Sequence, residues 1–220
     1  MYLNSLNKSV NITFIRHGTT IYNEEDRVQG SSNIDLSEKG IDEINNININ
    51  NFNFDIFYHS PLNRSKDTLL GILKKYNKDI NEVGIKEDIL ITERKYGIFE
   101  GLTKNEINEK YPNLYNEWLI NENIKAEGIE NIENVIDRIK LFISKIISFD
   151  YYNILAVTHS GFLYALYKYI TNSKLALKPH EIDLKFNNCC IINLHINIIY
   201  DKMIMKLTID DKTFDKVIDF

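Results

Sequence analysis

Two patterns of apolar residues alternate along the chain, and each is typical of a different kind of element. Short, nearly continuous apolar runs, which are typical of buried strands, occupy residues 11–16, 54–59, 85–90 and 154–158. Segments with helical spacing of apolar residues occupy 37–50, 61–76, 103–121 with a break at Pro112, 132–148 and 162–170. Strands that alternate with helices in this way predict an α/β fold, a three-layer α/β/α sandwich with a mainly parallel central sheet and helices on both faces.

The C-terminal part of the chain has a different pattern. Two apolar runs, 189–196 and 203–209, are separated by Tyr200-Asp201-Lys202 and predict a hairpin that completes a sheet of about six strands. Residues 210–213 are polar, and we expect them to form a turn after the last strand. The length of 220 residues suits a single domain, residues 1–220, with a helical lid at about 101–130.

Composition and charge limit the classes of partner. The chain is 44% hydrophobic and 26% charged, as is typical of an ordered globular protein. Its net charge of -5 is unfavourable for binding nucleic acid, which requires a surplus of Lys and Arg. No segment approaches the roughly 20 apolar residues of a membrane-spanning helix, and the N-terminal residues lack the features of a signal peptide. We therefore expect a cytoplasmic protein that binds neither nucleic acid nor membranes.

Reactive side chains gather where the predicted strands end. They belong to Arg16-His17-Gly18, His59-Ser60-Pro61 with Arg64 just beyond, Thr92-Glu93-Arg94, and His159-Ser160-Gly161. Because ligands bind outside the carboxyl ends of the strands in such a sheet, we expect these four segments to converge. Taken singly, His17 could be a core histidine and Glu93 a solvated carboxylate. Their common position at strand ends favours a functional site.

The converging side chains suit phosphate chemistry. Two arginines and two histidines would form a concentrated positive pocket, and the forked guanidinium group matches phosphate oxygens. The same cations lower the proton affinity of a neighbouring imidazole, so that one histidine can stay neutral and attack phosphorus. Glu93 can give a proton to the departing alkoxide and later accept one from water. Gly18 fits a tight turn that lets backbone N–H groups approach the phosphoryl oxygens.

Five motifs, in this order, resemble those of the histidine phosphatase superfamily, which is also called the phosphoglycerate mutase-like family. They are Arg16-His17-Gly18-Thr19-Thr20 followed by Asn23, Arg27, Gln29 and Gly30; Asp35-Leu36-Ser37-Glu38-Lys39-Gly40; Ser60-Pro61-Leu62-Asn63-Arg64-Ser65; Glu93 to Gly97 with Glu100-Gly101-Leu102-Thr103; and Val157-Thr158-His159-Ser160-Gly161. The second motif departs from the family pattern, because it lacks a proline and has Ser37 in place of threonine. The resemblance covers about residues 12–166.

The resemblance implies a role for each residue of the expected site. His17 would be the nucleophile, Glu93 would be the proton donor, and the phosphoryl group would be held by Arg16, Arg64 and His159. The remaining contacts to the substrate would come from Gly18, Asn23, Gln29, Gly30 and Ser160. The expected partner is a small phosphorylated substrate, with no cofactor and with a homodimer as a possible assembly. No metal is expected, because the sequence lacks the ligand spacings of zinc and calcium sites.

Three functions are compatible with such a pocket. We favour a phosphomonoester hydrolase of the phosphatase branch that acts through a phosphohistidine intermediate. The first alternative is a cofactor-dependent phosphoglycerate mutase. Mutases of the family resemble one another in an arginine pair after the acidic motif, whereas residues 101–127 contain no arginine, Gly161 stands where mutases carry Asn, and Trp118 suggests an apolar lid. The second alternative is a catalytically silent binding or scaffold protein on the same fold.

Overall fold

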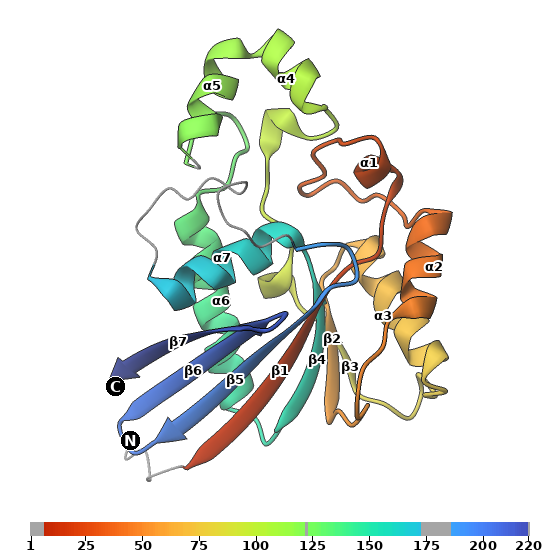
Figure 1. Ribbon diagram of the computed structural model, residues 1–220, viewed down its shortest axis with the longest axis vertical. Coiled ribbons are helices and arrows are strands. Elements are labelled where there is room, and N and C mark those ends of the chain that lie inside the picture. Colours follow the sequence, from red (N-terminus) through yellow and green to blue (C-terminus); the bar gives the residue numbers. More distant parts are fainter. Residues whose placement is uncertain (1–6, 122, 173–185, 220) are drawn as a thin grey trace.

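A single sheet with helices on both of its faces organises the chain (Figure 1). The computed structural model describes residues 7–121, 123–172 and 186–219. Within these residues the sheet has the strand order β3-β2-β4-β1-β5-β6-β7. The strands are β1 (Lys8–Arg16), β2 (Ile56–His59), β3 (Ile85–Glu87), β4 (Asn153–Thr158), β5 (Ile191–Ile199), β6 (Lys202–Ile209) and β7 (Lys212–Asp219). The first four strands pair in parallel and the last three add antiparallel to β1, which confirms the predicted α/β fold.

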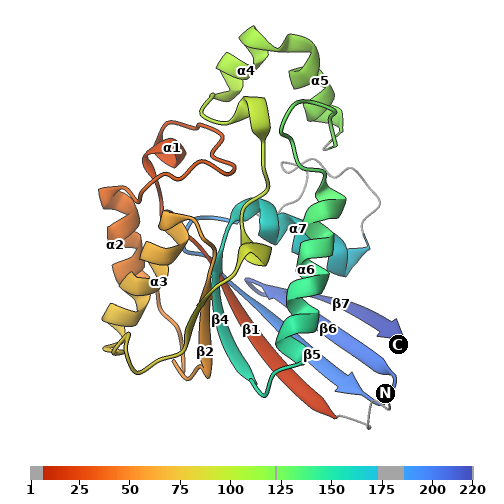
Figure 2. The same ribbon diagram turned by 180° about the vertical axis from the view of Figure 1, so that it is seen from behind.

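Two pairs of helices cover opposite faces of the sheet (Figure 2). They are α2 (Glu38–Asn46) and α3 (Asn63–Lys75) on one face, and α6 (Ile132–Ile147) and α7 (Ser160–Thr171) on the other. Neighbouring residues of one strand point to different faces, so Phe14 of β1 packs into the α6 and α7 core while Ile15 packs into the α2 and α3 core. Burial on both faces explains why the central strands are continuous apolar runs in the sequence.

Short helices lie beyond the carboxyl ends of the strands (Figure 1). They are α1 (Ile21–Glu24), α4 (Lys104–Lys110) and α5 (Pro112–Ile120), with the 3-10 helices η1 (Ile89–Ile91) and η2 (Gly97–Phe99). A separate hydrophobic cluster of Phe99, Ile107 and Ile124 holds α4 and α5 together. The single domain and the lid at about 101–130 stay predictions. No helix in the described part of the chain is long and apolar enough to cross a membrane.

Three elements differ from the sequence-based expectation. The expected strand over residues 85–90 ends at Glu87, because Asp88 Oδ1 accepts the N–H of Leu90 at 3.0 Å and begins η1. The helix expected to reach about residue 50 ends at Asn46. The turn after β6 is present, with a φ of 51° at Asp210, but the chain then returns as a further strand, β7. The expectation that β6 is the last strand was therefore wrong.

The strand register positions the candidate site. Arg16 at the end of β1 pairs with Thr158 at the end of β4, and His59 at the end of β2 pairs with Val157. Thr158 Oγ1 also donates to Ile91 O at 2.8 Å, which ties the segment after β3 to the same edge. The four reactive segments of the sequence therefore begin next to one another.

Candidate active site

The two strand-end histidines face each other at this edge. The ring centroids of His17, which follows β1, and His159, which begins α7, are 5.1 Å apart. Both side chains are buried, and so is Arg64 in the first turn of α3. The structure thus brings together three residues that are up to 142 positions apart in the sequence, by the difference between 159 and 17.

The ring of His17 is held in one tautomer. Its Nδ1 lies 2.8 Å from Gly18 O, a carbonyl that can only accept, so Nδ1 carries the hydrogen and Nε2 carries a lone pair. Burial lowers the pKa of His17 well below its ordinary value, and the positive charges of Arg16 and Arg64 lower this pKa further. His17 is therefore a neutral imidazole at pH 7 with a nucleophilic nitrogen.

Gly18 packs closely but does not offer its backbone donor to the pocket. Its N–H donates to Thr68 Oγ1 at 2.9 Å. A Cβ at this position would lie 2.9 Å from Gly40 O, so the glycine allows the chain after β1 to pass close to α2. The expectation that this N–H approaches the phosphoryl oxygens is corrected accordingly.

His159 is bonded on one side of its ring. Its Nε2 lies 2.6 Å from Ser60 Oγ, which also accepts the N–H of Leu62 at 3.3 Å. With that lone pair occupied, the Ser60 hydroxyl can donate to Nε2, and the ring hydrogen then sits on Nδ1. Nδ1 is buried and has no hydrogen-bond partner among the described residues. Burial, and then the charges of Arg64, His17 and Arg16, lower the pKa of His159 well below its ordinary value.

Two buried guanidinium groups lie beside the imidazoles. Arg64 donates from Nη1 to Ser32 O at 2.6 Å and from Nη2 to Gly30 O at 2.8 Å, which fixes its fork. The Nε atoms of Arg16 and Arg64 are buried without a hydrogen-bond partner among the described residues. Burial lowers the pKa of Arg64 to about 10 and also lowers the pKa of Arg16. Both groups still carry their charge at pH 7, and buried cations of this kind favour an anionic ligand.

The carboxylate of Glu93 is held by the first turn of α7. Its Oε2 accepts the N–H of Gly161 at 3.2 Å and the hydroxyl of Ser160 at 3.4 Å, and its Oε1 accepts the N–H of Arg94 at 2.8 Å. A Cβ on Gly161 would lie only 2.4 Å from Glu93 Oε1. The glycine therefore allows the carboxylate to lie against the helix.

A small cavity joins most of the expected site residues. It has a volume of about 180 Å3. Its lining residues are Arg16, His17, Asn23, Arg27, Val28, Gln29, Gly30, Glu93, Tyr96, Trp118 and Ser160. Arg64 and His159 lie behind this lining, against His17, and Gly18 lies outside it. Gly30, with a φ of 51°, turns its carbonyl to Arg64 and leaves room for Glu100.

Several residues of the site gave no sequence signal that we used. Asn188 Nδ2 donates to His17 O at 2.9 Å and to Asn23 Oδ1 at 3.2 Å. Glu43 of α2 accepts both the N–H and the hydroxyl of Thr19, at 2.9 and 2.8 Å. Asparagine is so frequent in this chain that Asn188 did not stand out. The helical spacing of α2 predicts a buried face but does not indicate which polar residue bonds to the loop after β1.

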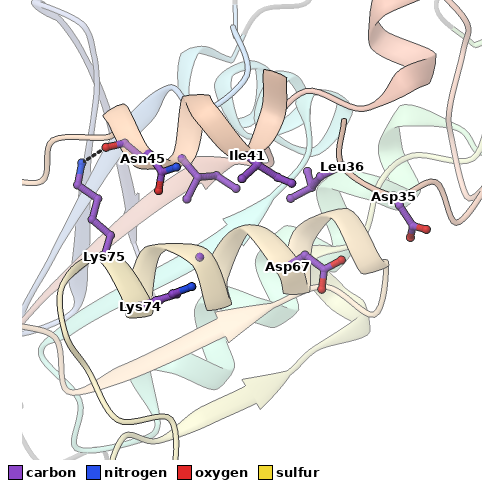
Figure 3. A pocket seen from close by; sticks show the side chains of 9 residues that line it. Asp35, Leu36, Ile41, Asn45, Asp67, Lys74 and Lys75 are labelled. Atoms are coloured by element: carbon purple, nitrogen blue, oxygen red, sulfur yellow. Dashed lines mark hydrogen bonds between the residues drawn. The ribbon is translucent and has the colours of Figure 1, made fainter. Parts of the chain in front are cut away.

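A second cavity lies in the groove between α2 and α3 (Figure 3). It has a volume of about 590 Å3 and an apolar floor that includes Leu36 and Ile44. Asp35 and Asp67 lie at one end and the Lys74 and Lys75 side chains at the other, with Lys75 donating to Asn45 O at 2.7 Å. None of the expected site residues lines this groove. Among the described residues, no group of three or more His, Cys, Asp or Glu is placed to hold a metal ion.

Comparisons of sequence give matches to phosphatases and mutases. The family model described as "Histidine phosphatase superfamily (branch 1)" matches residues 12–199. The chain is 33% identical over 130 residues to the 2,3-bisphosphoglycerate-dependent phosphoglycerate mutase of Wigglesworthia glossinidia brevipalpis, covering 57% of this chain and 55% of that protein. It is 30% identical over 140 residues to phosphoserine phosphatase 1 of Hydrogenobacter thermophilus, covering 62% of this chain and 64% of that protein. The chain thus spans about half the length of the curated relatives it matches.

Comparisons of fold extend over nearly the whole chain. The alpha-ribazole phosphatase from Shigella flexneri superposes with a TM-score of 0.73 and 19% identity, covering 96% of each chain. The phosphoglycerate mutase from Bacillus anthracis superposes with a TM-score of 0.73 and 24% identity, covering 93% of this chain and 92% of that chain. At these identities the likeness concerns the fold alone, which both phosphatases and mutases adopt.

Proposed function

The chain belongs to the histidine phosphatase superfamily (branch 1), and on this premise we propose that it is a metal-independent phosphomonoesterase that acts through a phosphohistidine intermediate. The observation that carries the proposal is the state of His17. A buried, neutral imidazole presents Nε2 beside two guanidinium groups and a second imidazole. Glu93 lines the same cavity. This combination supplies a nucleophile, a cationic cradle and a proton carrier for phosphoryl transfer.

The first half of the proposed reaction transfers the phosphoryl group to the enzyme. Nε2 of His17 attacks phosphorus, and the bond between phosphorus and the ester oxygen breaks. The carboxyl group of Glu93, in its protonated form, gives its proton to the departing alkoxide, and the alcohol leaves. Arg16 and Arg64 balance the negative charge on the equatorial oxygens, and His159 Nδ1 can donate one further hydrogen bond.

The second half returns the enzyme to its starting state. Glu93, now a carboxylate, accepts a proton from a water molecule as that water attacks phosphorus. The bond between phosphorus and His17 Nε2 breaks, which restores the neutral imidazole and releases inorganic phosphate. The net reaction is an ester plus water giving an alcohol plus phosphate, so protons and charges balance.

The outer part of the cavity favours hydrolysis over the mutase reaction. Arg27 is the one outer lining residue with a positive charge, and Glu25 and Glu106 already neutralise it with salt bridges of 2.6 and 2.7 Å. Tyr96 and Trp118 supply an aromatic wall on the same side. A substrate with a second strongly anionic group therefore finds little counter-charge among the described lining residues. The mutase remains the second candidate because a phosphoglycerate mutase is among the relatives at 33% identity.

The substrate is proposed only as a class, a small phosphorylated metabolite. The relatives are named for phosphoglycerate, phosphoserine and alpha-ribazole chemistry, and these names describe those proteins. The cytoplasmic location, the homodimer and the substrate contacts of Asn23, Gln29, Gly30 and Ser160 stay predictions.

The proposal is tested by phosphate release from p-nitrophenyl phosphate in the presence of EDTA. We expect turnover without added metal, and we expect His17→Ala to reduce it by about three orders of magnitude or more and to abolish trapping of a radiolabelled phosphoenzyme. His195→Ala is the matched control, because His195 lies in β5 and bonds to Asn11 at 2.5 Å.

Two results would contradict the proposal. Wild-type turnover in His17→Ala would remove the nucleophile, and isomerisation of phosphoglycerate faster than its hydrolysis would establish the mutase instead. A chain that neither hydrolyses nor isomerises phosphate esters, but still binds phosphate, would be the silent binding protein.

A further inference from the structure

The segment that leads into β5 contacts the Arg16-His17 pair along its length. Arg16 Nη1 donates to Phe186 O at 2.5 Å, and Arg16 N donates to Cys190 O at 3.2 Å. Between these two contacts, Asn188 Nδ2 donates to His17 O at 2.9 Å. A residue 171 positions away in the sequence is thereby held beside the proposed nucleophile.

Hydrogen-bond partners fix the orientation of two side-chain amides. The carbonyl oxygen of His17 can only accept, so the Asn188 atom that faces it is the amide nitrogen. The same nitrogen donates to Asn23 Oδ1 at 3.2 Å. Asn23 Oδ1 also accepts from the backbone N–H of Thr20 at 3.2 Å and from the Thr20 hydroxyl at 3.1 Å. Because a backbone N–H can only donate, the orientation of Asn23 is fixed as well.

Three donors therefore surround one end of the Asn23 amide. The other end, Nδ2, is the polar atom that Asn23 can present to the cavity, which it lines together with Arg16 and His17. We propose that Asn188 is a positioning residue, which holds Asn23 so that the two hydrogens of Asn23 Nδ2 are directed at the phosphoryl group. This inference rests on the proposed function, because it takes the cavity to be the phosphoryl site.

A pair of variants separates this role from simple packing. Asn188→Ala removes the donor and leaves space for a water molecule, which can donate to His17 O and Asn23 Oδ1 in its place. Asn188→Asp keeps the shape of the side chain but places carboxylate oxygens against two acceptor oxygens. If Asn188 acts as a donor, the Asp variant is the more damaged of the two. If it acts only by filling space, the nearly isosteric Asp variant is the less damaged.

The experiment measures the affinity for inorganic phosphate by calorimetry, together with kcat and KM for p-nitrophenyl phosphate. We expect phosphate to bind about tenfold more weakly to Asn188→Ala and about a hundredfold more weakly to Asn188→Asp. Asn193→Ala is the matched control, because Asn193 lies further along β5 and accepts from Thr13 at 3.0 Å. Its phosphate affinity should stay within about twofold of the wild type, as is usual for a surface substitution.

A double-mutant cycle tests whether the effect passes through Asn23. In an Asn23→Ala background, Asn188→Ala should weaken phosphate binding by less than about twofold further, since its target is already absent. A full tenfold loss in that background, or an Asp variant that binds phosphate better than the Ala variant, would overturn the inference. Calorimetry needs no turnover, so failure of the proposed hydrolysis and failure of this inference are seen separately.

Discussion

The contact between Gly161 and Glu93 yields a sharp prediction. In Gly161→Ala the added Cβ would lie 2.4 Å from Glu93 Oε1, whereas ordinary contacts of this kind are about 3.5 Å. The flexible carboxylate must therefore move by about 1 Å. Displacement of a reacting group by that amount costs about a hundredfold in rate. We expect kcat for alkyl phosphates, whose leaving groups need a proton, to fall by about this factor.

The leaving group and the stability identify the cause. A p-nitrophenolate leaves without full protonation, so p-nitrophenyl phosphate should lose about tenfold or less, and Glu93→Gln should show the same selectivity. Gly161 lies in the first turn of α7, where alanine is a better helix former, so the free energy of unfolding should stay within about 1 kcal/mol of the wild type. Activity and stability are thus separated in one variant.

A matched control is available at another glycine. In Gly84→Ala the added Cβ would meet Ile56 at 3.6 Å, an ordinary contact, so both substrates should be turned over at the wild-type rate. Steady-state kinetics with an alkyl and an aryl ester provide the measurement. If Gly161→Ala loses the same factor with both esters, Glu93 is not the proton donor that the leaving group requires.

Two further predictions concern pH and the aromatic wall. Because burial lowers the pKa of His17 and of His159 well below 6.5, the unfolded chain binds more protons than the folded chain below about pH 6.5. The free energy of unfolding should therefore decrease as the pH falls from 7 to 5, by up to about 1.4 kcal/mol per pH unit for each histidine, and His17→Gln should show a shallower decrease in urea unfolding; equal slopes would contradict the lowered pKa. Trp118→Ala should raise KM for phenyl phosphate about tenfold, through loss of apolar contact, while the inhibition constant of inorganic phosphate stays unchanged. A parallel rise in that inhibition constant would show that Trp118 acts on the phosphoryl site itself.

The sequence was informative wherever the geometry of a parallel sheet determines position. His17 and His159 each follow a buried apolar strand, and β1 pairs with β4 in register, so both residues emerge at the same edge. The glycine and arginine positions of the motifs also fall beside this edge. Because strand direction and register follow from buried apolar runs, the convergence could be predicted before any coordinates were examined.

The remaining features depend on contacts that no periodicity reports. In β7 the apolar residues Phe214, Val217 and Ile218 do not alternate, since an edge strand has little need of a continuous buried face, and the strand was missed. The bond from Gly18 N to Thr68 and the bonds of Asn188 join residues distant in the sequence. Such polar pairs form because the fold brings a donor and an acceptor together, and neither residue type announces its partner.

The cation cluster behind the cavity also bears on the enzyme after its reaction is complete. Two charged guanidinium groups with unpartnered Nε atoms, among the described residues, make the empty pocket costly, and a tetrahedral dianion relieves that cost. The last product to leave, inorganic phosphate, satisfies the same groups as the substrate. Phosphate therefore stabilises the fold in proportion to its concentration and competes with incoming ester, so departure of the product limits turnover where phosphate is abundant.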